Sequence, residues 1–167
     1  MRSTSKSKSA APKAIDAIAL LKADHKQVKT WFAEFEATKS SGKKAKLATQ
    51  ICAALTVHTE IEEQIFYPAF LAATRDKDMH HEAIIEHDGA KKLIAQIQAS
   101  SPADDYFDSK VHVLSEMIKH HVKEEEQAGG MFAEARQARK MDLNSLGAAM
   151  AERKNVLMAK TRATAPR

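Results

Sequence analysis

The sequence has a single cysteine, Cys52, so no disulfide can form within the chain. Aromatic residues make up 5% of the 167 residues, and there are five glycines and four prolines. No apolar run approaches the roughly 20 residues that a membrane-spanning helix needs. These shortages exclude an internally disulfide-stapled fold and a membrane span, and they lead us to expect a soluble, cytoplasmic protein.

The residues that are abundant favour helix. Alanine, lysine, glutamate, leucine and isoleucine dominate the sequence, and all of them are common in helices. Hydrophobic residues make up 44% of the chain, which is enough for a sizeable core in one domain of this length. We therefore predict an all-α chain with one folded domain.

The formal net charge of +4 is unevenly distributed. Residues 1–13 contain four basic residues and no acid, and residues 136–167 contain eight basic residues and two acids. Basic ends can contact nucleic acid or an anionic surface, but solvated tails are the simpler interpretation, and the first 13 residues lack the apolar stretch of a signal peptide. We predict a flexible basic tail at 1–13, a helical bundle at 14–135 and a basic helical extension at 136–167, with neither nucleic acid nor a membrane as partner.

Helix-capping and helix-breaking residues between the apolar periodic segments divide the chain into helices. Asp76 or Asp78 can cap a helix, Pro102 suits the first position of another, and Gly129-Gly130 ends it. Pro68 should kink or terminate the regular pattern around it. Four long helices are predicted at about 14–38, 43–73, 78–99 and 103–127, with weaker signals at 131–139 and 144–160.

Polar residues continue the apolar stripe of every long helix. Apolar side chains recur at steps of three and four, which places them on one face. The polar members of these stripes are His25, His58, Glu62, His87, His121 and Glu125. A single buried histidine is usually a core imidazole bonded to a neighbour, but four imidazoles and two carboxylates without partners would each be costly to bury. A bound metal ion satisfies them together.

The order of these residues repeats within the chain. His58/Glu62 and His121/Glu125 are each four residues apart, so both members share one helix face at about 5–6 Å. The sequence "EEQ" recurs at 62–64 and 125–127, and the two halves align at an offset of about 62 residues. This repeat predicts two matching helical hairpins that form an antiparallel up-down four-helix bundle around a pseudo-twofold site.

The pattern H…HxxxE…H…HxxxE, with the flanking "EEQIFYP" and "HHVKEEE", resembles the hemerythrin-like family, specifically its HHE cation-binding domains. The resemblance covers about residues 14–135. It implies a left-twisted four-helix bundle that holds two iron ions joined by an oxo or hydroxo bridge. The six residues named above match the family's motif, and the two glutamates would bridge the ions.

The sequence departs from the oxygen-carrying hemerythrins at two points. Their third helix has a second histidine one turn before the first, where this chain has Ala83. The acid of the fourth helix follows its histidine by four residues rather than five, so Glu126 is the alternative to Glu125, and the internal repeat favours Glu125. Six ligands give two octahedral ions about eight of twelve donors, and a bridging group gives two more. About two positions remain for O₂, peroxide or NO.

Other metal motifs fit less well. An HExxH zinc site beginning at His81 would need histidine where Ile85 stands. A ferritin-like site needs a glutamate three residues before a histidine on one helix, and no histidine here has one. Imidazole and carboxylate together suit iron, with zinc or manganese as alternatives.

Several neighbouring polar residues have a plainer interpretation than a role in the site. Tyr67 can reach an open iron position, but packing is the simpler role. Asp24 and Glu86 can orient ligands across helix contacts, although solvated positions are favoured. Cys52 is expected in the core. Surface or supporting roles are expected for the remaining histidines, His80, His81, His112 and His120.

These patterns predict a non-haem di-iron protein that binds or senses O₂ or NO. The alternative is an enzyme that reduces peroxide or oxidises Fe(II), or a protein that handles iron. A third interpretation makes the metal structural and the basic ends a docking element. The sequence leaves these uses and the oligomeric state open.

Overall fold

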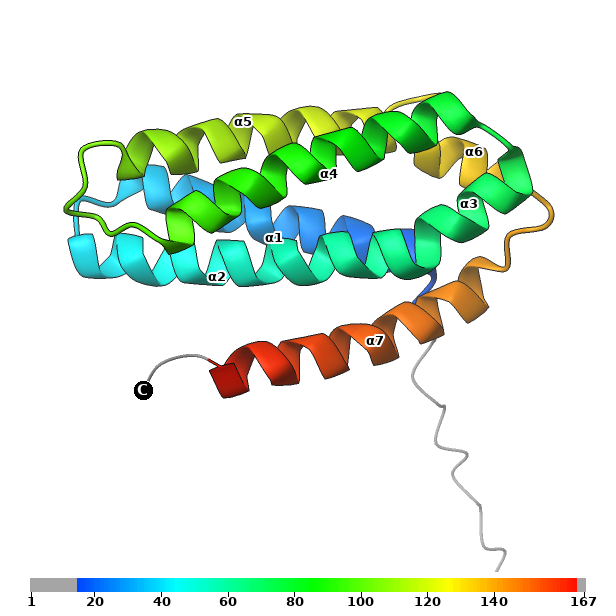
Figure 1. Cartoon of the computed structure of the whole chain (residues 1–167). Coiled ribbons are helices and arrows are strands. Elements are labelled where there is room, and N and C mark those ends of the chain that lie inside the picture. The colour runs from blue at the N-terminus through cyan, green and yellow to red at the C-terminus, as the bar shows by residue number, and fades with distance from the viewer. Residues whose placement is uncertain (1–14, 165–167) are drawn as a thin grey trace, which may run out of the picture.

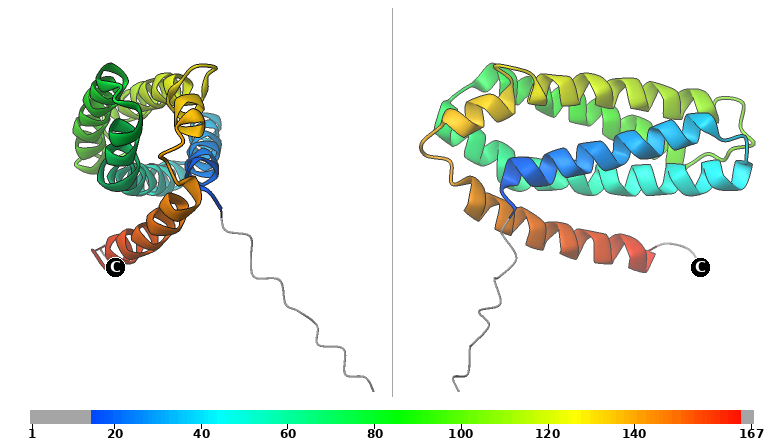
Figure 2. Two further views of the ribbon diagram at one scale, coloured as in Figure 1. Left: turned by 90° about the vertical axis from the view of Figure 1, so that its right-hand side faces the viewer. Right: turned by 180° about the vertical axis from the view of Figure 1, so that it is seen from behind.

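The computed structural model describes residues 15–164, and all regular structure in that range is helical. Four helices form the bundle, and each packs against its two neighbours around a ring, in the order α1, α2, α4, α5 (Figures 1 and 2). The predicted all-α bundle is therefore confirmed. The four helices are α1 (Ala17–Ala37), α2 (Ser41–Ile61), α4 (Lys77–Gln98) and α5 (Phe107–Glu126).

Side-chain caps fix the starts of three of these helices. Asp16 accepts a hydrogen bond from the Ala19 amide at 2.8 Å, and Ser40 accepts one from Lys43 at 3.2 Å. Asp76, one of the two predicted caps, accepts one from Met79 at 2.9 Å. Each cap satisfies an amide that has no partner within its helix.

The fourth bundle helix starts later than the sequence predicts. Asp104 accepts the Ser101 amide on its side chain at 2.6 Å and the Phe107 amide on its carbonyl at 3.0 Å. These bonds hold the segment from 101 to 106 in turns, because a short acidic side chain competes with the helix for nearby amides. The predicted start at residue 103, with Pro102 in the first turn, is wrong, and α5 begins at Phe107.

A π-helical turn interrupts the second hairpin arm where Pro68 approaches. This turn, η1 (Glu62–Phe66), joins α2 to the short helix α3 (Tyr67–Thr74). Pro68 has no amide proton to donate, and just before it the Tyr67 amide reaches five residues back to the Glu62 carbonyl. The chain bends toward α4 over this segment (Figure 1).

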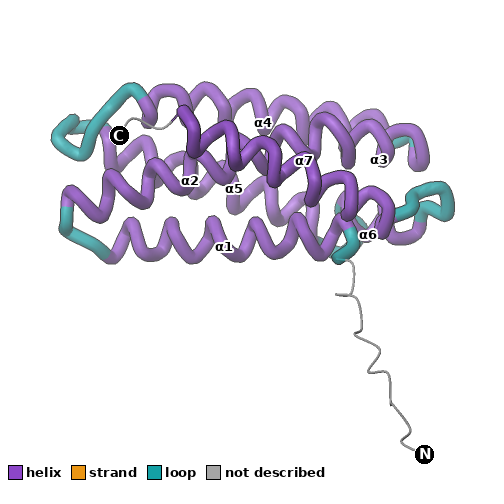
Figure 3. The backbone as a smooth tube through the Cα atoms, turned by 90° about the horizontal axis from the view of Figure 1, so that it is seen from below, coloured by secondary structure: helices purple, strands orange, loops and turns teal. Residues whose placement is uncertain are grey.

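Two further helices lie at the end of the chain. The first, α6 (Met131–Gln137), packs against α5 and α3, and the second, α7 (Leu143–Thr164), runs outside the bundle along α1 and α2 (Figure 3). The predicted boundary between residues 135 and 136 falls within α6, and the predicted tail at 1–13 lies outside the described residues. None of the described helices is long and apolar enough to cross a membrane.

A polar layer divides the hydrophobic core into two clusters. One cluster lies at the end of the bundle that α3, α6 and α7 cover, and it includes Leu21, Ile61, Phe66 and Met131. The other occupies the opposite half and includes Val28, Leu55, Ile94 and Leu114. On α1, His25 lies between Leu21 and Val28, and polar residues interrupt the other three bundle helices at the same level.

Candidate metal centre

The six predicted site residues come together in this polar layer. The elements α1, α2, η1 and α4 contribute one residue each, and α5 contributes two. All six are buried, with 8% or less of the residue exposed: His25, His58, Glu62, His87, His121 and Glu125. Such burial requires that the polar groups share partners with one another or with a bound ion.

The four imidazoles form two pairs. His25 Nε2 lies 3.1 Å from His58 Nε2, which brings α1 and α2 together. His87 Nε2 lies 3.1 Å from His121 Nε2, which joins α4 and α5 in the same way. The two hairpins therefore contribute equivalent pairs, as the internal repeat predicts.

Each glutamate lies between the two imidazole pairs. Glu62 Oε2 is 3.3 Å from His58 Nε2 and 3.2 Å from His87 Nε2. Glu125 places Oε2 3.3 Å from His25 Nε2 and Oε1 3.4 Å from His121 Nε2. Both carboxylates thus span from one pair to the other.

These spacings fit metal coordination. Donors about 2.1 Å from one ion and at right angles to each other are about 3 Å apart, close to the separations within each pair. The donors divide into two groups that share Glu62. Glu62 Oε1 is buried without a hydrogen-bond partner among the described residues, a costly arrangement that a cation would relieve.

A carboxylate faces the outer nitrogen of every imidazole. Each Nδ1–H donates to it, which directs the lone pair of Nε2 into the centre. The pairs are His25 with Glu126 at 2.7 Å, His58 with Asp24 at 3.3 Å, His87 with Glu63 at 2.9 Å, and His121 with Glu86 at 2.5 Å.

Three of these carboxylates also pair with a lysine or histidine on the side away from the centre. Lys91 donates to both oxygens of Glu63 at 2.6 Å, Lys154 of α7 pairs with Asp24, and His120 pairs with Glu86 at 3.0 Å. The preference for solvated positions at Asp24 and Glu86 is therefore wrong. The sequence places them beside ligands on their own helices, whereas the structure has them contact histidines of the adjacent helices.

Tyr67 carries its hydroxyl into the centre. The oxygen lies 3.0 Å from Glu125 Oε1 and 3.1 Å from His87 Nε2, with Glu62 Oε2 and His121 Nε2 both at 3.4 Å. A packing role alone does not account for these four contacts. In a regular α-helix, residues five apart point about 140° away from each other, but the π turn brings Tyr67 over the face that carries Glu62.

The carboxylates control protonation in the metal-free centre. Burial on its own would lower the pKa of His58, but Glu62 and Asp24 outweigh it and raise that pKa to about 10. Burial opposes ionisation of Glu62, yet the neighbouring His58 and His87 hold its pKa well below the usual range. Burial, reinforced by the charges of Glu62 and Glu125, raises the pKa of Tyr67, so its phenol keeps the proton.

The other polar residues lie around this centre. His112 pairs with Glu36 at the surface and His81 is exposed, while His80 is partly buried beside Tyr67. Cys52 is buried in the core, where burial raises the pKa of its thiol to about 12. Phe132 of α6 stacks on His25 with ring centroids 5.9 Å apart, and so closes one side of the centre.

The bundle and its central layer of four imidazoles and two carboxylates define a cation-binding four-helix protein. The sequence profile of the hemerythrin HHE cation binding domain matches residues 16–129, and the chain belongs to this family. Membership implies that the centre binds cations, for which iron is the typical ion of the family.

Two known proteins are similar to this chain. A hemerythrin HHE cation binding domain-containing protein from Mycobacterium kansasii has the same fold, with a TM-score of 0.72 and 22% identity over 87% of this chain and 89% of its own. A DNA nickase from Nostoc sp. (strain PCC 7120 / SAG 25.82 / UTEX 2576) is 31% identical over 117 residues, or 70% of this chain. The match spans 32% of the nickase, so this chain corresponds to about a third of that relative.

Proposed function

We propose that this protein holds two iron ions in its central layer and uses them to bind or sense a small diatomic ligand, O₂ or NO. One observation carries the proposal: Glu62 and Glu125 each lie between two imidazole pairs that are spaced like donors to one ion. His25 and His58 would hold one ion, and His87 and His121 the other. Both glutamates would serve the two ions together.

The balance of charge supports this assignment. Two Fe(II) ions bring four positive charges and the two glutamates two negative ones. The acids that face Nδ1 of the four histidines supply the rest of the balance, although lysines partly offset Asp24 and Glu63. Iron held by these six residues would supply coordination positions and electrons for a small ligand.

Tyr67 has its own part in this proposal. Its protonated hydroxyl lies among ligand atoms of both groups, so it can donate a hydrogen bond to a small molecule at the centre. The aromatic ring and Phe66 beside it are fully buried and keep bulk water from that side. Tyr67 thus offers a hydrogen-bond donor aimed at the centre from a side that bulk water does not reach.

Peroxide reduction is the second candidate, and the same hydroxyl favours it. Conversion of hydrogen peroxide to two waters consumes two protons and two electrons; Tyr67 can donate a hydrogen bond to the peroxide, and the protons would come from solvent. The electrons would come from an external reductant. No DNA nicking is proposed, because the match covers a third of the nickase. A cytoplasmic location remains part of the proposal, supported by the one unpaired cysteine.

One experiment separates the two candidates. Iron-loaded protein is reduced under anaerobic conditions and then mixed with O₂, NO or hydrogen peroxide. The visible spectrum is followed over time. A binding protein forms a long-lived adduct with O₂ or NO that reverses when the ligand is removed. Repeated consumption of peroxide in proportion to protein and added reductant would instead make the protein an enzyme and contradict the binding role.

A further inference from the structure

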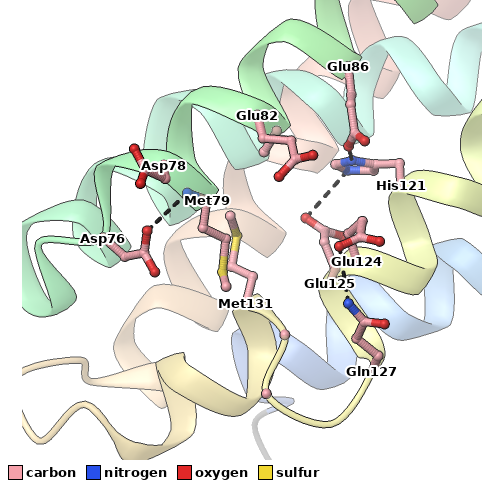
Figure 4. A pocket seen from close by; sticks show the side chains of 13 residues that line it. Asp76, Asp78, Met79, Glu82, Glu86, His121, Glu124, Glu125, Gln127 and Met131 are labelled. Atoms are coloured by element: carbon pink, nitrogen blue, oxygen red, sulfur yellow. Dashed lines mark hydrogen bonds and ion pairs between the residues drawn. The ribbon is translucent and has the colours of Figure 1, made fainter.

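A pocket of about 280 Å³ leads from the surface to one side of the metal centre. It lies between the start of α4 and the end of α5, near α6 (Figure 4). His121 and Glu125 line its inner wall, although they are only 4% and 1% exposed. The pocket is thus a path by which a small solute reaches two candidate ligands.

Carboxylates dominate the charge of this pocket, and His121 is the one basic group that lines it among the described residues. Its lining includes six carboxylates and, in the part of the chain that the structure describes, neither lysine nor arginine: Asp76, Asp78, Glu82, Glu86, Glu124 and Glu125. Glu82 and Glu86 of α4 face His121 and Glu125 of α5 in Figure 4. None of the six carboxylates pairs with a lysine or arginine among the described residues, so the pocket attracts cations.

The inner end of the pocket carries donors of two kinds. Glu125 Oε1 lies 3.4 Å from His121 Nε2, and both residues line the pocket. From the mouth inward, carboxylates give way to the mixed imidazole and carboxylate donors of the centre. Oxygen donors bind divalent iron more weakly than such a mixed set does, so an ion would be passed inward rather than retained.

The turn after α5 shapes the wall of the pocket. Gly129 has φ of +75°, a conformation that favours glycine. A Cβ on Gly130 would lie 2.4 Å from the Glu124 carbonyl oxygen and 3.0 Å from that of Glu125. The two glycines therefore let the chain turn tightly against the end of α5 and continue into α6.

We propose that this acid-lined pocket is the entrance through which divalent cations reach the buried centre. The inference rests on the proposed metal-binding function and adds the route of loading. It assigns Asp78, Glu82 and Glu124 to electrostatic attraction of the ion, whereas the six central residues hold it. Neutralising these three acids should slow metal uptake without changing how much metal is finally bound.

The test compares two triple variants with equal net charge. The entrance variant carries Asp78→Asn, Glu82→Gln and Glu124→Gln, and the control carries Glu34→Gln, Asp105→Asn and Glu152→Gln at exposed positions away from the pocket. Metal-free protein is mixed with Co²⁺ in a stopped-flow instrument, and the visible ligand-field band reports binding. Final occupancy is measured by elemental analysis after long incubation.

The entrance variant should take up Co²⁺ about tenfold more slowly at low ionic strength, while the control stays close to the unmodified protein. Added salt should slow the unmodified protein more than the entrance variant, because screening weakens an attraction that the variant lacks. Equal rates for both variants, or lost occupancy in the entrance variant, would overturn the inference. Failure of the unmodified protein to take up Co²⁺ would overturn the proposed function as well.

Discussion

At the scale of single residues, position relative to the imidazoles distinguishes one glutamate from the next along the chain. Glu62 and Glu125 are almost fully buried between the histidine pairs, whereas Glu63 and Glu126 accept Nδ1–H bonds from outside. Substitution of Glu62 or Glu125 takes away carboxylate oxygens that lie between the two histidine pairs. Substitution of Glu63 or Glu126 leaves all proposed donors in place.

The first prediction follows from this difference. Glu62→Ala or Glu125→Ala should reduce iron from two ions per chain to one or none, and should abolish the rise in melting temperature that metal gives. Glu63→Ala and Glu126→Ala should keep both ions. Metal analysis of the four variants under identical loading gives the answer. Loss of iron from Glu126→Ala with retention in Glu125→Ala would reverse the assignment and favour the five-residue spacing.

A second residue-scale prediction concerns Tyr67. Tyr67→Phe keeps the buried ring but removes the only aromatic hydroxyl within 3.4 Å of the described ligand atoms. Iron content should remain, and NO should dissociate about fivefold faster, since one hydrogen bond contributes about 1 kcal/mol. Tyr106→Phe, which alters an exposed ring away from the centre, is the control. Equal NO dissociation rates for both variants would rule out the proposed hydrogen bond.

At the scale of helices, regular periodicity made the main part of the site predictable. All six proposed ligands interrupt apolar stripes at α-helical spacing, and the repeat paired them by hairpin. Tyr67 was named as a possible contact of the centre but ranked below a packing role, because η1 changes the rotation per residue and no local signal in "EEQIF" fixes a π turn. Asp24 and Glu86 were named as possible supports of the ligands but ranked as solvated, because their contacts cross between helices, where sequence spacing gives no distance. The ligand role itself remains a prediction.

The weak helical signals at 131–139 and 144–160 correspond to α6 and α7, but periodicity gave no indication of which helices α7 packs against. We propose that α7 braces the bundle, since it packs along α1 and α2 and its Lys154 contacts the Asp24 carboxylate behind His58. Gly147 of α7 lies directly against the backbone at the start of α1. A Cβ there would lie 2.4 Å from the Ile15 carbonyl oxygen and 2.7 Å from the Ala17 amide nitrogen.

A third prediction tests this packing. Gly147→Ala should lower the free energy of unfolding by about 1–3 kcal/mol, because a methyl group there must push α7 off the start of α1. Gly42→Ala is the control, since its Cβ meets nothing nearer than Ser40 Oγ at 4.0 Å, and it should be neutral or stabilise by up to about 1 kcal/mol. Chemical denaturation measures both, and a Gly147→Ala protein as stable as the unmodified one would exclude the close contact.

At the scale of the whole molecule, the polar layer links stability to protons and metal. In the metal-free protein the pKa of His58 rises to about 10 from an ordinary value of 6.5. Protonated His58 therefore stabilises the folded state fully below pH 6.5, and this contribution is lost as pH rises through about 10. Bound metal would replace the proton at Nε2 and remove this dependence.

The fourth prediction is a difference between two pH profiles. The free energy of unfolding of the metal-free protein should fall steadily from pH 7 to pH 10, and that of the iron-loaded protein should fall much less over the same range. Denaturant titrations at several pH values measure both. Parallel profiles would mean that metal does not replace the imidazole proton.

The number of metal ions per chain tests the central claim most directly. Metal-free protein is titrated anaerobically with Fe(II), freed of unbound iron, analysed for metal and then exposed to air. The bridging positions of Glu62 and Glu125 predict two irons per chain and a visible charge-transfer band after oxidation. A single tightly bound ion, with no uptake of a second at excess metal, would contradict the di-iron centre.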